Sequence, residues 1–467
     1  MSVSLPARID EWLAAHRREI VGDLADLVGI PSVSLPGDSV APFGQPCRDA
    51  IDHMLALGRR HGYGTHNYDY YVGAIEFARG DAAVGFWAHL DVVPVPDPDA
   101  WDYPPFRATV VEDRYIIGRG VQDNKAPAIG VFHVMNCLRD LGVALRHGYT
   151  LYLGTNEECG MEDARYFAAR YPCPDLSIVP DSGFPVCCAQ RGAMTLRLSV
   201  PFVPRVRIEM SNNPSVTPEE ITALLSGGET IRVRGRSAHV YDAAGKDNAV
   251  IQMLNALSLR YPGQADALRA LVALSDATDG APLGLSFTDS LSGPLMMAPT
   301  RMDAADGRLC IDVFAILPVT CDPDALIRGA SAACYLKGVG VDVLRLRRPV
   351  SFPSAHPVVG LLTDTYNEVM HTQSAPFAMS GGNYAACLPN AFGFGPGMPG
   401  RAFPRHIFRE GHGDYHQCDE SEDIERLLDF MRVYAMSVVR LDALDALSIK
   451  GVNHGNEKLS GDPARGA

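Results

Sequence analysis

The sequence has no long hydrophobic run. No apolar stretch approaches the roughly 18 residues that a membrane-spanning helix needs. The first residues, MSVSLPARIDEWLAAHRREI, carry charges throughout and contain no apolar centre, so they do not have the pattern of a secretory signal peptide. We therefore expect no membrane partner and a cytoplasmic location.

The sequence also lacks the cysteine spacings that build disulfide scaffolds or zinc fingers. Its 11 cysteines are an odd number, and no two of them form a CxxC pair. Free thiols in a reducing compartment are the expected state. Basic residues are in deficit, since 41 Lys and Arg stand against 55 Asp and Glu. The net charge of −14 argues against a nucleic-acid partner. It does not exclude a small substrate, because the local charge of a site can oppose the global sign.

The pattern of apolar and polar residues changes along the 467 residues of the sequence. Strand-like and helix-like segments alternate up to about residue 185, with charged residues at the ends of the strands, which is the α/β pattern. From about 190 to 350, apolar and polar residues alternate in MTLRLSV, TIRVRGRS, CIDVFAIL and VDVLRLRR, as in half-exposed antiparallel strands. Helices are predicted there over about 218–225 and 246–260.

The predicted fold class is therefore α/β, in two domains. A discontinuous first domain comprises residues 1–188 and 354–445, because the alternation of helix-like and strand-like segments returns at about residue 355. An inserted α+β domain comprises residues 189–353. The remaining segment, residues 446–467, is a polar C-terminal tail that we expect to be frayed.

The stretch VGFWAHLD (84–91) is predicted to be a buried strand that ends in His89 and Asp91. Side chains alternate across a strand, so these two point to the same side. The histidine can offer a ring nitrogen to a metal ion while the carboxylate orients the ring. Taken alone, the pair is more often a core histidine satisfied by a neighbour.

Further acidic and imidazole residues recur at predicted strand ends and turns. Neighbouring carboxylates repel one another unless a cation lies between them. Several carboxylates with two histidines suit a pair of zinc or manganese ions bridged by one carboxylate, with another carboxylate left free to move protons. The candidates are Asp123, Glu157, Glu158, Asp181 and a histidine cluster of His406, His412 and His416.

The ordered motifs resemble the M20 metallopeptidase family, and its PepV-like dipeptidase branch most closely. The resemblance covers about two thirds of the chain and implies a zinc-exopeptidase-like catalytic domain with an inserted lid domain. The matching segments are IPSVS (30–34), PCRDAIDHMLALGRRHG (46–62), YVGAIEF (71–77), HLDVVPV (89–95), WDYPPF (101–106), GRGVQDNKAP (118–127), GTNEECG (154–160), VPDSGFP (179–185), SGGNYAACLPNAFGFGP (380–396) and HQCDE (416–420).

The resemblance implies five metal ligands: His89, Asp123, Glu158, Asp181 and His416. It pairs His89 with Glu158 on one ion and Asp181 with His416 on the other, and Asp123 bridges both. His416 is preferred to His406 and His412 because of its spacing to the following Asp-Glu. A cis peptide is expected between Asp123 and Asn124.

The catalytic roles are likewise implied by the resemblance. Asp91 orients His89. Glu157 is the general base, which takes a proton from the bridging water and passes it to the leaving amine. In the insert, GRSAHVYDAAGKDNAV (235–250) places His239 where a lid histidine reaches the developing oxyanion. The alternative for His239 is an exposed histidine at a strand end.

One position departs from the family pattern. Its dipeptidases carry an Arg-Tyr-Pro on a lid strand, and the arginine grips the substrate carboxylate, but here Ile316 stands in its place. Either another cation acts, with Arg191, Arg301 and Arg401 as candidates, or the substrate lacks a carboxylate there. The lid's usual Asn-x-Val-Pro is also poorly matched.

The predicted function is metal-dependent hydrolysis of an amide bond in a dipeptide or small N-acyl amino acid. Two divalent ions are implied, with Zn²⁺ preferred and Mn²⁺ or Co²⁺ as alternatives. The expected partner is a small peptide or amide substrate, and a monomer and a homodimer both remain open. The alternatives are a deacylase acting on a non-dipeptide amide, and a catalytically silent homologue that only binds a ligand; the filled metal and base positions argue against silence.

Overall fold

The computed structural model describes residues 3–211, 213–241, 247–445 and 447. Almost all of the predicted tail lies outside the described residues. The chain divides into two compact units. The first unit comprises Met1–Cys188, Ser351–Phe377 and Asn383–Ala467, and the second comprises Ala189–Val350 and Ala378–Gly382. No helix in the described ranges is both long and apolar enough to cross a membrane.

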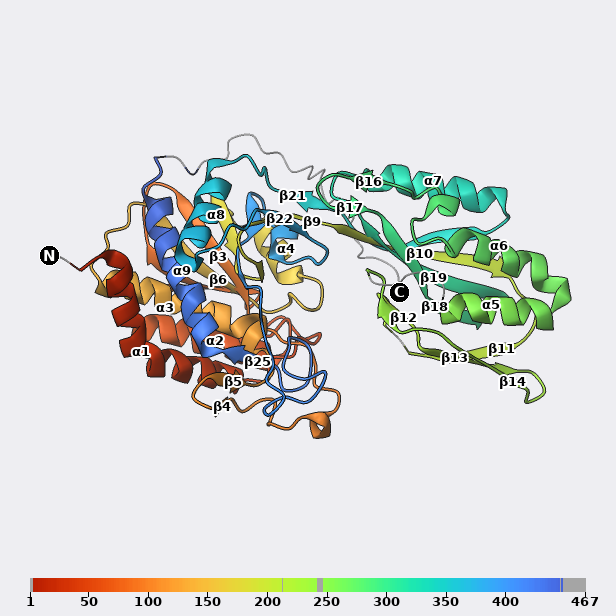
Figure 1. Ribbon diagram of the computed structural model, residues 1–467, viewed down its shortest axis with the longest axis horizontal. Helices are drawn as coiled ribbons and strands as arrows, with labels where there is room; N and C mark the ends of the chain where they lie inside the picture. The colour runs from red at the N-terminus through yellow and green to blue at the C-terminus, as the bar shows by residue number, and fades with distance from the viewer. Residues whose placement is uncertain (1–2, 212, 242–246, 446, 448–467) are drawn as a thin grey trace. The chain divides into compact units, whose positions relative to one another are not determined.

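The first unit is built on a mixed sheet (Figure 1). Strand β3 runs parallel to both β6 and β7, and β7 runs parallel to β23, while β1 and β2 pair antiparallel. Because β3, β6 and β7 are parallel, their carboxyl ends meet at one edge. The strand order is β1 (Gly64–Tyr68), β2 (Val72–Ala78), β6 (Gly148–Gly154), β3 (Ala83–His89), β7 (Leu176–Val179), β23 (Ala391–Gly393), β9 (Cys187–Gln190) and β21 (Val350–Ser351), with β22 (Phe377–Met379) paired to β9.

Both faces of this sheet are buried, against two different hydrophobic cores. In β3, Phe86 and Ala88 face the larger core, and Trp87 faces the smaller one, because neighbouring side chains alternate. This two-sided burial explains the continuous apolar run of VGFWA. The larger core is closed by helices α1 (Leu5–Val28), α2 (Gln45–Arg60), α3 (Ala126–Asp140), α8 (Pro357–Met370) and α9 (Ile424–Asp442), and the smaller by α4 (Glu162–Arg170).

Helices α1, α3 and α9 pack against one another along one flank of the first unit (Figure 1). A small second sheet of β4 (Thr109–Val111), β5 (Tyr115–Ile117) and β25 (Ser421–Asp423) brings the segment before α9 next to residues 115–117. Strands β8 (Ser182–Gly183) and β24 (Pro396–Gly397) form a separate two-stranded parallel sheet. Residues 115–123 and 413–423 are thereby neighbours in space although they are about 300 positions apart in sequence.

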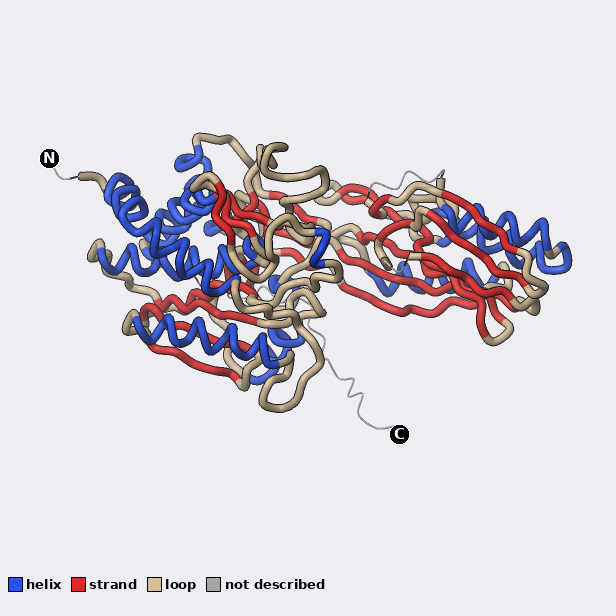
Figure 2. Tube along the Cα trace, turned by 90° about the horizontal axis from the view of Figure 1, so that it is seen from below, coloured by secondary structure: helices blue, strands red, loops and turns tan. Residues whose placement is uncertain are grey.

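The second unit is an α+β structure with its own core. Its main sheet is antiparallel, and helices lie beside it (Figure 2). Alternate residues of the central strands belong to the same hydrophobic core as residues of the helices. The sheet order is β18 (Met296–Ala305), β19 (Arg308–Leu317), β10 (Gly192–Pro201) and β20 (Gly340–Arg347), and the helices are α5 (Ala249–Arg260), α6 (Ala265–Ser275) and α7 (Pro323–Leu336). A smaller sheet consists of β11 (Val206–Met210), β13 (Glu220–Leu225) and β14 (Thr230–Arg234).

The α/β class with an inserted α+β domain is confirmed, and so is the helix predicted near 246–260. The helix predicted over about 218–225 is wrong, because Glu220–Leu225 forms strand β13. Ile221, Ala223 and Leu225 are buried at every second position, and β11 and β14 pair with the strand on either side. The central strands β10 and β19 are also more buried than the alternation predicted.

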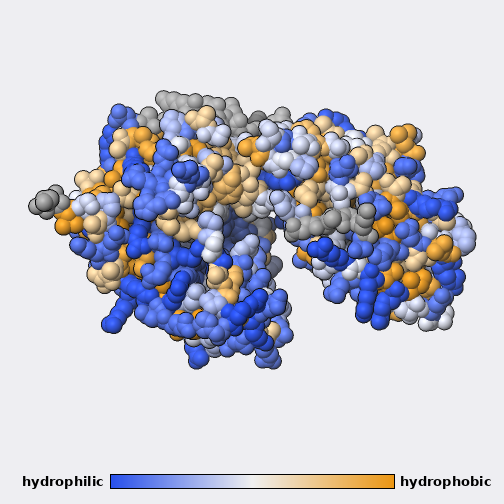
Figure 3. All heavy atoms as spheres, in the orientation of Figure 1, coloured by the Kyte–Doolittle hydropathy of each residue, from blue (hydrophilic) through white to orange (hydrophobic). Residues whose placement is uncertain are grey.

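On the face seen in Figure 3, hydrophilic and hydrophobic side chains are intermixed over both units. Isolated exposed apolar residues of this kind are ordinary on globular proteins and need no functional explanation.

Candidate metal centre

The edge at which β3, β6 and β7 end carries the predicted site residues. His89 is the last residue of β3 and lies opposite Gly154, the last residue of β6. Glu157 and Glu158 follow β6 in a tight turn, and Asp181 follows β7. The parallel pairing thus brings three separate segments to one end of the sheet.

Two groups of potential metal ligands overlap at this edge. His89, Asp123 and Asp181 form one group, and Asp123, Glu158 and His416 form the other, with the ligand atoms of each group within 4.8 Å of one another. Asp123 belongs to both. Its Oδ1 lies 2.9 Å from His89 Nε2, and its Oδ2 lies 3.1 Å from His416 Nε2. One carboxylate therefore faces two imidazoles, one with each oxygen.

The grouping differs from the pairing implied by the resemblance. His89 shares its group with Asp181, and His416 shares its group with Glu158, at 2.9 Å from Nε2 to Oε1. The proximity of these side chains differs from the expected sharing of one ion by His89 and Glu158 and of the other by Asp181 and His416, which stays a prediction. The reason is topological, because β3 and β7 are neighbouring strands and bring the residues at their ends together.

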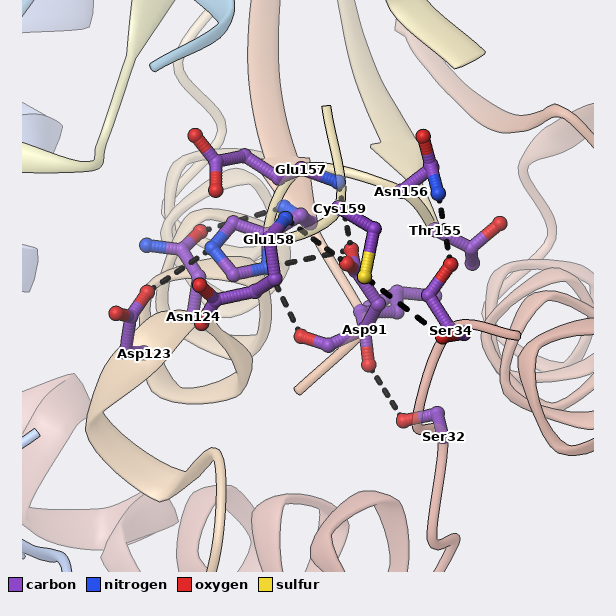
Figure 4. A network of polar contacts seen from close by, with 12 residues as sticks. Ser32, Ser34, Asp91, Asp123, Asn124, Thr155, Asn156, Glu157, Glu158 and Cys159 are labelled. Carbon is purple, nitrogen blue, oxygen red and sulfur yellow. Dashed lines mark hydrogen bonds and ion pairs between the residues drawn. The ribbon is translucent and has the colours of Figure 1, made fainter. Parts of the chain in front are cut away.

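Asp91 contacts both His89 and the Glu157-Glu158 turn. The Nδ1 of His89 lies 2.9 Å from the backbone oxygen of Asp91 and 3.5 Å from its carboxylate. A carbonyl oxygen only accepts, so Nδ1 donates and Nε2 is left free to bind an ion. The Asp91 carboxylate accepts the backbone N–H groups of Glu157 and Glu158, both at 3.1 Å (Figure 4). This second contact was not predicted from the sequence.

Glu157 and Glu158 send their side chains in different directions (Figure 4). Glu158 contacts His416, whereas the Glu157 carboxylate has no hydrogen-bond or ion-pair partner within the described part of the chain. One of the two neighbours can therefore bind an ion while the other faces a substrate.

Asp123 is placed by a residue that sequence reasoning did not single out, Glu420. The two oxygens of this buried carboxylate accept the N–H groups of Gly120, Gln122 and Asp123 at 3.0–3.1 Å. They also accept a 2.6 Å hydrogen bond from Arg119, which is itself buried. The only signal in the sequence was its place in the HQCDE motif. The expected cis peptide between Asp123 and Asn124 is present.

The three candidate histidines of the 406–416 cluster lie in different environments. His406 contacts Glu112 at the surface, and His412 Nδ1 lies 2.5 Å from the buried carboxylate of Asp419. Only His416 reaches Asp123 and Glu158. Asp419 also accepts the N–H of Asp102, whose carboxylate pairs with Arg409, so this neighbouring cluster ties two loops together.

The electrostatics of the edge fit the binding of cations. Burial and the nearby charge of Asp181 raise the pKa of Glu157 well above its ordinary value. Burial and the charge of Asp123 raise the pKa of Asp181 to about 7. Burial acts to lower the pKa of His416, but its hydrogen bonds to Asp123 and Glu158 outweigh this and raise the pKa to about 10. Without cations, the cluster holds protons to offset its crowded negative charge, and a set of carboxylate oxygens and imidazole nitrogens suits divalent ions such as zinc.

The remaining predicted residues lie in the second unit or away from the edge. His239 is exposed at the end of the two-residue strand β15 (Ala238–His239), so its oxyanion role stays a prediction. Ile316 is buried beside Val240 and Ala298. Arg191 donates to the backbone oxygens of Pro294 and Ile316.

The other two candidate arginines already have partners. Arg301 lies 4.0 Å from Asp312 in the second unit. Arg401 donates to the Ser421 oxygen and lies 4.0 Å from Glu422 in the first unit.

Comparisons with known proteins agree with the motifs. Residues 85–436 match Peptidase family M20/M25/M40. The chain is 25% identical over 474 residues to YtjP of Bacillus subtilis (strain 168), covering 91% of this chain and 97% of that protein. It is 24% identical over 474 residues to the Beta-Ala-Xaa dipeptidase of Lactobacillus delbrueckii subsp. lactis, with coverage of 92% and 97%.

Solved structures share the fold. Human carnosine dipeptidase 1 aligns with a TM-score of 0.62 at 14% identity, covering 95% of this chain and 100% of that one. The dipeptidase Dug1p from Saccharomyces cerevisiae also gives 0.62, at 12% identity, with coverage of 95% and 99%. The family match spans most of the sequence and includes His89, Asp123, Glu157, Asp181 and His416. The chain therefore belongs to peptidase family M20/M25/M40.

Proposed function

We propose that this protein hydrolyses the amide bond of a dipeptide or a similar small N-acyl amino acid, with the aid of two divalent metal ions. His89 and Asp181 would hold one ion, Glu158 and His416 the other, and Asp123 both. Zn²⁺ is the preferred ion, because the donors are imidazole nitrogens and carboxylate oxygens, and Mn²⁺ and Co²⁺ are alternatives. The observation that carries the proposal is the Asp123 carboxylate between His89 and His416.

Ions bound there would polarise the substrate carbonyl and lower the pKa of a bound water. Glu157 would accept a proton from the attacking water and deliver it to the leaving nitrogen. Its free carboxylate and its burial, which raises its pKa, support both halves of this proton transfer near neutral pH. Asp91 would hold the backbone of Glu157 in place. His239 is proposed as a donor to the developing oxyanion.

The Beta-Ala-Xaa dipeptidase among the relatives supports a dipeptide substrate. The 11 cysteines, an odd number with no CxxC pair, support a cytoplasmic location, because such a set of thiols suits a reducing compartment. Either a monomer or a homodimer is compatible with the site residues.

The test is Glu157→Gln, assayed on a panel of dipeptides and N-acyl amino acids with added zinc, manganese or cobalt. Loss of the base should lower kcat by at least about 100-fold. Metal content should stay at two ions per chain. Glu162→Gln is the matched control, because Glu162 is exposed at the start of α4 and its removal should leave turnover unchanged. Full turnover in E157Q, or in wild-type protein after thorough chelation, would refute the proposal.

Ile316 favours a second candidate function, hydrolysis of an amide that has no free carboxylate. Its buried aliphatic side chain cannot bind a carboxylate, and Arg191 next to it already donates to two backbone oxygens. Including N-acyl amides with a blocked carboxyl group in the panel separates the two candidates. A dipeptidase should prefer the free acid, whereas the second candidate should cleave the blocked amide at least as fast. A protein that only binds its ligand would cleave none of them.

A further inference from the structure

A second buried carboxylate, Asp163, lies behind the Glu157-Glu158 turn. It belongs to the first turn of α4 and is fully buried. Its Oδ2 accepts the N–H of Thr155 at 2.7 Å, the N–H of Asn156 at 2.8 Å and the hydroxyl of Tyr384 at 2.5 Å. Its Oδ1 accepts the N–H of Ala164. All four partners donate, so this carboxylate acts purely as an acceptor, and none of the described cations pairs with it.

Two carboxylates together hold four consecutive backbone N–H groups. Asp163 binds those of Thr155 and Asn156. Asp91 binds those of Glu157 and Glu158 (Figure 4). The backbone of residues 155–158, which carries Glu157, is thus held by two buried carboxylates. Hydrogen bonds to ionised acceptors are about twice as strong as neutral ones, so this arrangement limits the movement of the turn.

Tyr384 reaches this carboxylate from a different part of the chain. Its residue number differs from that of Asp163 by 221, and its side chain is 1% exposed. Its ring packs edge-on to Trp87 and His89. The hydroxyl is closely packed on the side of Gly154, because a Cβ at Gly154 would collide with both the Tyr384 hydroxyl and Asp163. The tyrosine hydroxyl is therefore a close-packed support for the acceptor that holds residues 155 and 156.

We propose that Tyr384, acting through Asp163, is a positioning residue for Glu157. The inference rests on the proposed role of Glu157 as the general base. Without the hydroxyl, the Asp163 carboxylate would keep only its three backbone N–H donors, and its buried Oδ2 would lose one of three hydrogen bonds. The turn would then gain freedom to move. A displacement of about 1 Å in a catalytic group can cost on the order of 100-fold in rate.

The test compares Tyr384→Phe with Tyr434→Phe in the full-length, metal-loaded protein. Tyr434 is a matched control, because it is also 1% exposed and its hydroxyl donates a 2.6 Å hydrogen bond, to the backbone oxygen of Phe394 in the larger core. Each variant loses one buried hydroxyl bond. Y384F should lower kcat by about 10- to 100-fold. Its KM should change by less than about two-fold, because the bonds that the substrate makes in the ground state are retained. Y434F should keep the wild-type kcat.

Two further measurements separate positioning from general damage. In a Glu157→Gln background, Y384F should reduce the residual rate no further, because the group that it positions is gone. Hydrogen exchange should speed up at the amides of residues 155–158 in Y384F and remain unchanged in Y434F. If Y384F does not fold, Asp163→Asn, which removes the shared acceptor charge, should give the same kinetic and exchange results.

Equal kcat values for Y384F and Y434F, or a Y384F effect that multiplies with that of E157Q, would overturn the inference. The outcome is distinguishable from failure of the proposed function. If wild-type protein cleaves nothing on the panel, or if E157Q keeps full turnover, the proposed function fails. Hydrogen exchange then tests on its own whether the Tyr384 hydroxyl restrains the turn. Unchanged exchange at residues 155–158 in Y384F would overturn this role, and faster exchange would support it.

Discussion

Replacement of Glu420 by glutamine should destabilise the first unit, because it breaks the buried ion pair between Glu420 and Arg119. The Glu420 side chain is 1% exposed and that of Arg119 is 3% exposed, with 2.6 Å between Nη1 and Oε2. Glutamine keeps the volume of the side chain but removes its charge. Its NH₂ group, a donor, would face other donors: either the N–H groups of Gln122 and Asp123 or the Arg119 guanidinium. Arg119 would be left as a buried cation without an anionic partner.

Removal of one member of such a buried pair typically costs about 3–5 kcal/mol. In a unit of this size that corresponds to a drop in Tm of roughly 6–10 °C. The assay is calorimetry of the metal-free protein, so that loss of ions does not contribute. Glu368→Gln is the control, because Glu368 pairs with Arg440 at the same 2.6 Å but is 67% exposed. Its loss should cost less than about 1 kcal/mol.

A double mutant checks the cause. In Arg119→Met/Glu420→Gln both charges are gone, so the cost should be smaller than the sum of the two single changes. A Tm for E420Q within about 2 °C of the E368Q value, which is less than about 1 kcal/mol, would refute the claim that a buried, unpaired charge is what the fold avoids. Strict additivity in the double mutant would refute it as well.

Two further predictions concern pH and close packing. Burial and the charge of Asp123 raise the pKa of Asp181 from 3.8 to about 7, and hydrogen bonds to Asp123 and Glu158 raise that of His416 from 6.5 to about 10 despite burial. The stability that these raised pKa values give the metal-free fold is fully present below the ordinary values and is lost as pH rises through about 7 and about 10. Metal binding requires both groups deprotonated, so the Tm gain on adding zinc should increase between about pH 6 and 9, and a gain that falls with pH would contradict the assignment. Gly154→Ala should destabilise the protein by about 1–3 kcal/mol in thermal unfolding, because its Cβ would meet Tyr384 and Asp163. Gly22→Ala in α1, where nothing lies within 4 Å, should instead stabilise by about 0.5–1 kcal/mol, and equal effects at the two sites would contradict the steric argument.

Local patterns were enough to predict most elements and the kinds of residue in the site. The apolar run ending in His89 specified a strand buried on both faces, because two-sided burial leaves no polar positions. The ordered motifs named the family. The EITALL segment (220–225) fits a short helix as well as a strand, because Ile221, Leu224 and Leu225 have helical spacing while the residues at 221, 223 and 225 alternate. Only pairing with β11 and β14 decides between them.

Residue type and position relative to a strand end are local properties, so the amino-acid order is enough to indicate which side chains could hold ions and move a proton. Which of these side chains meet depends on long-range packing. His89 groups with Asp181 because β3 and β7 are adjacent, and Glu420 reaches Arg119, 301 residues away in sequence. Tyr384 supports Asp163 in the same way. Such contacts depend on how distant segments pack, and no local periodicity encodes the hydrogen bonds between them.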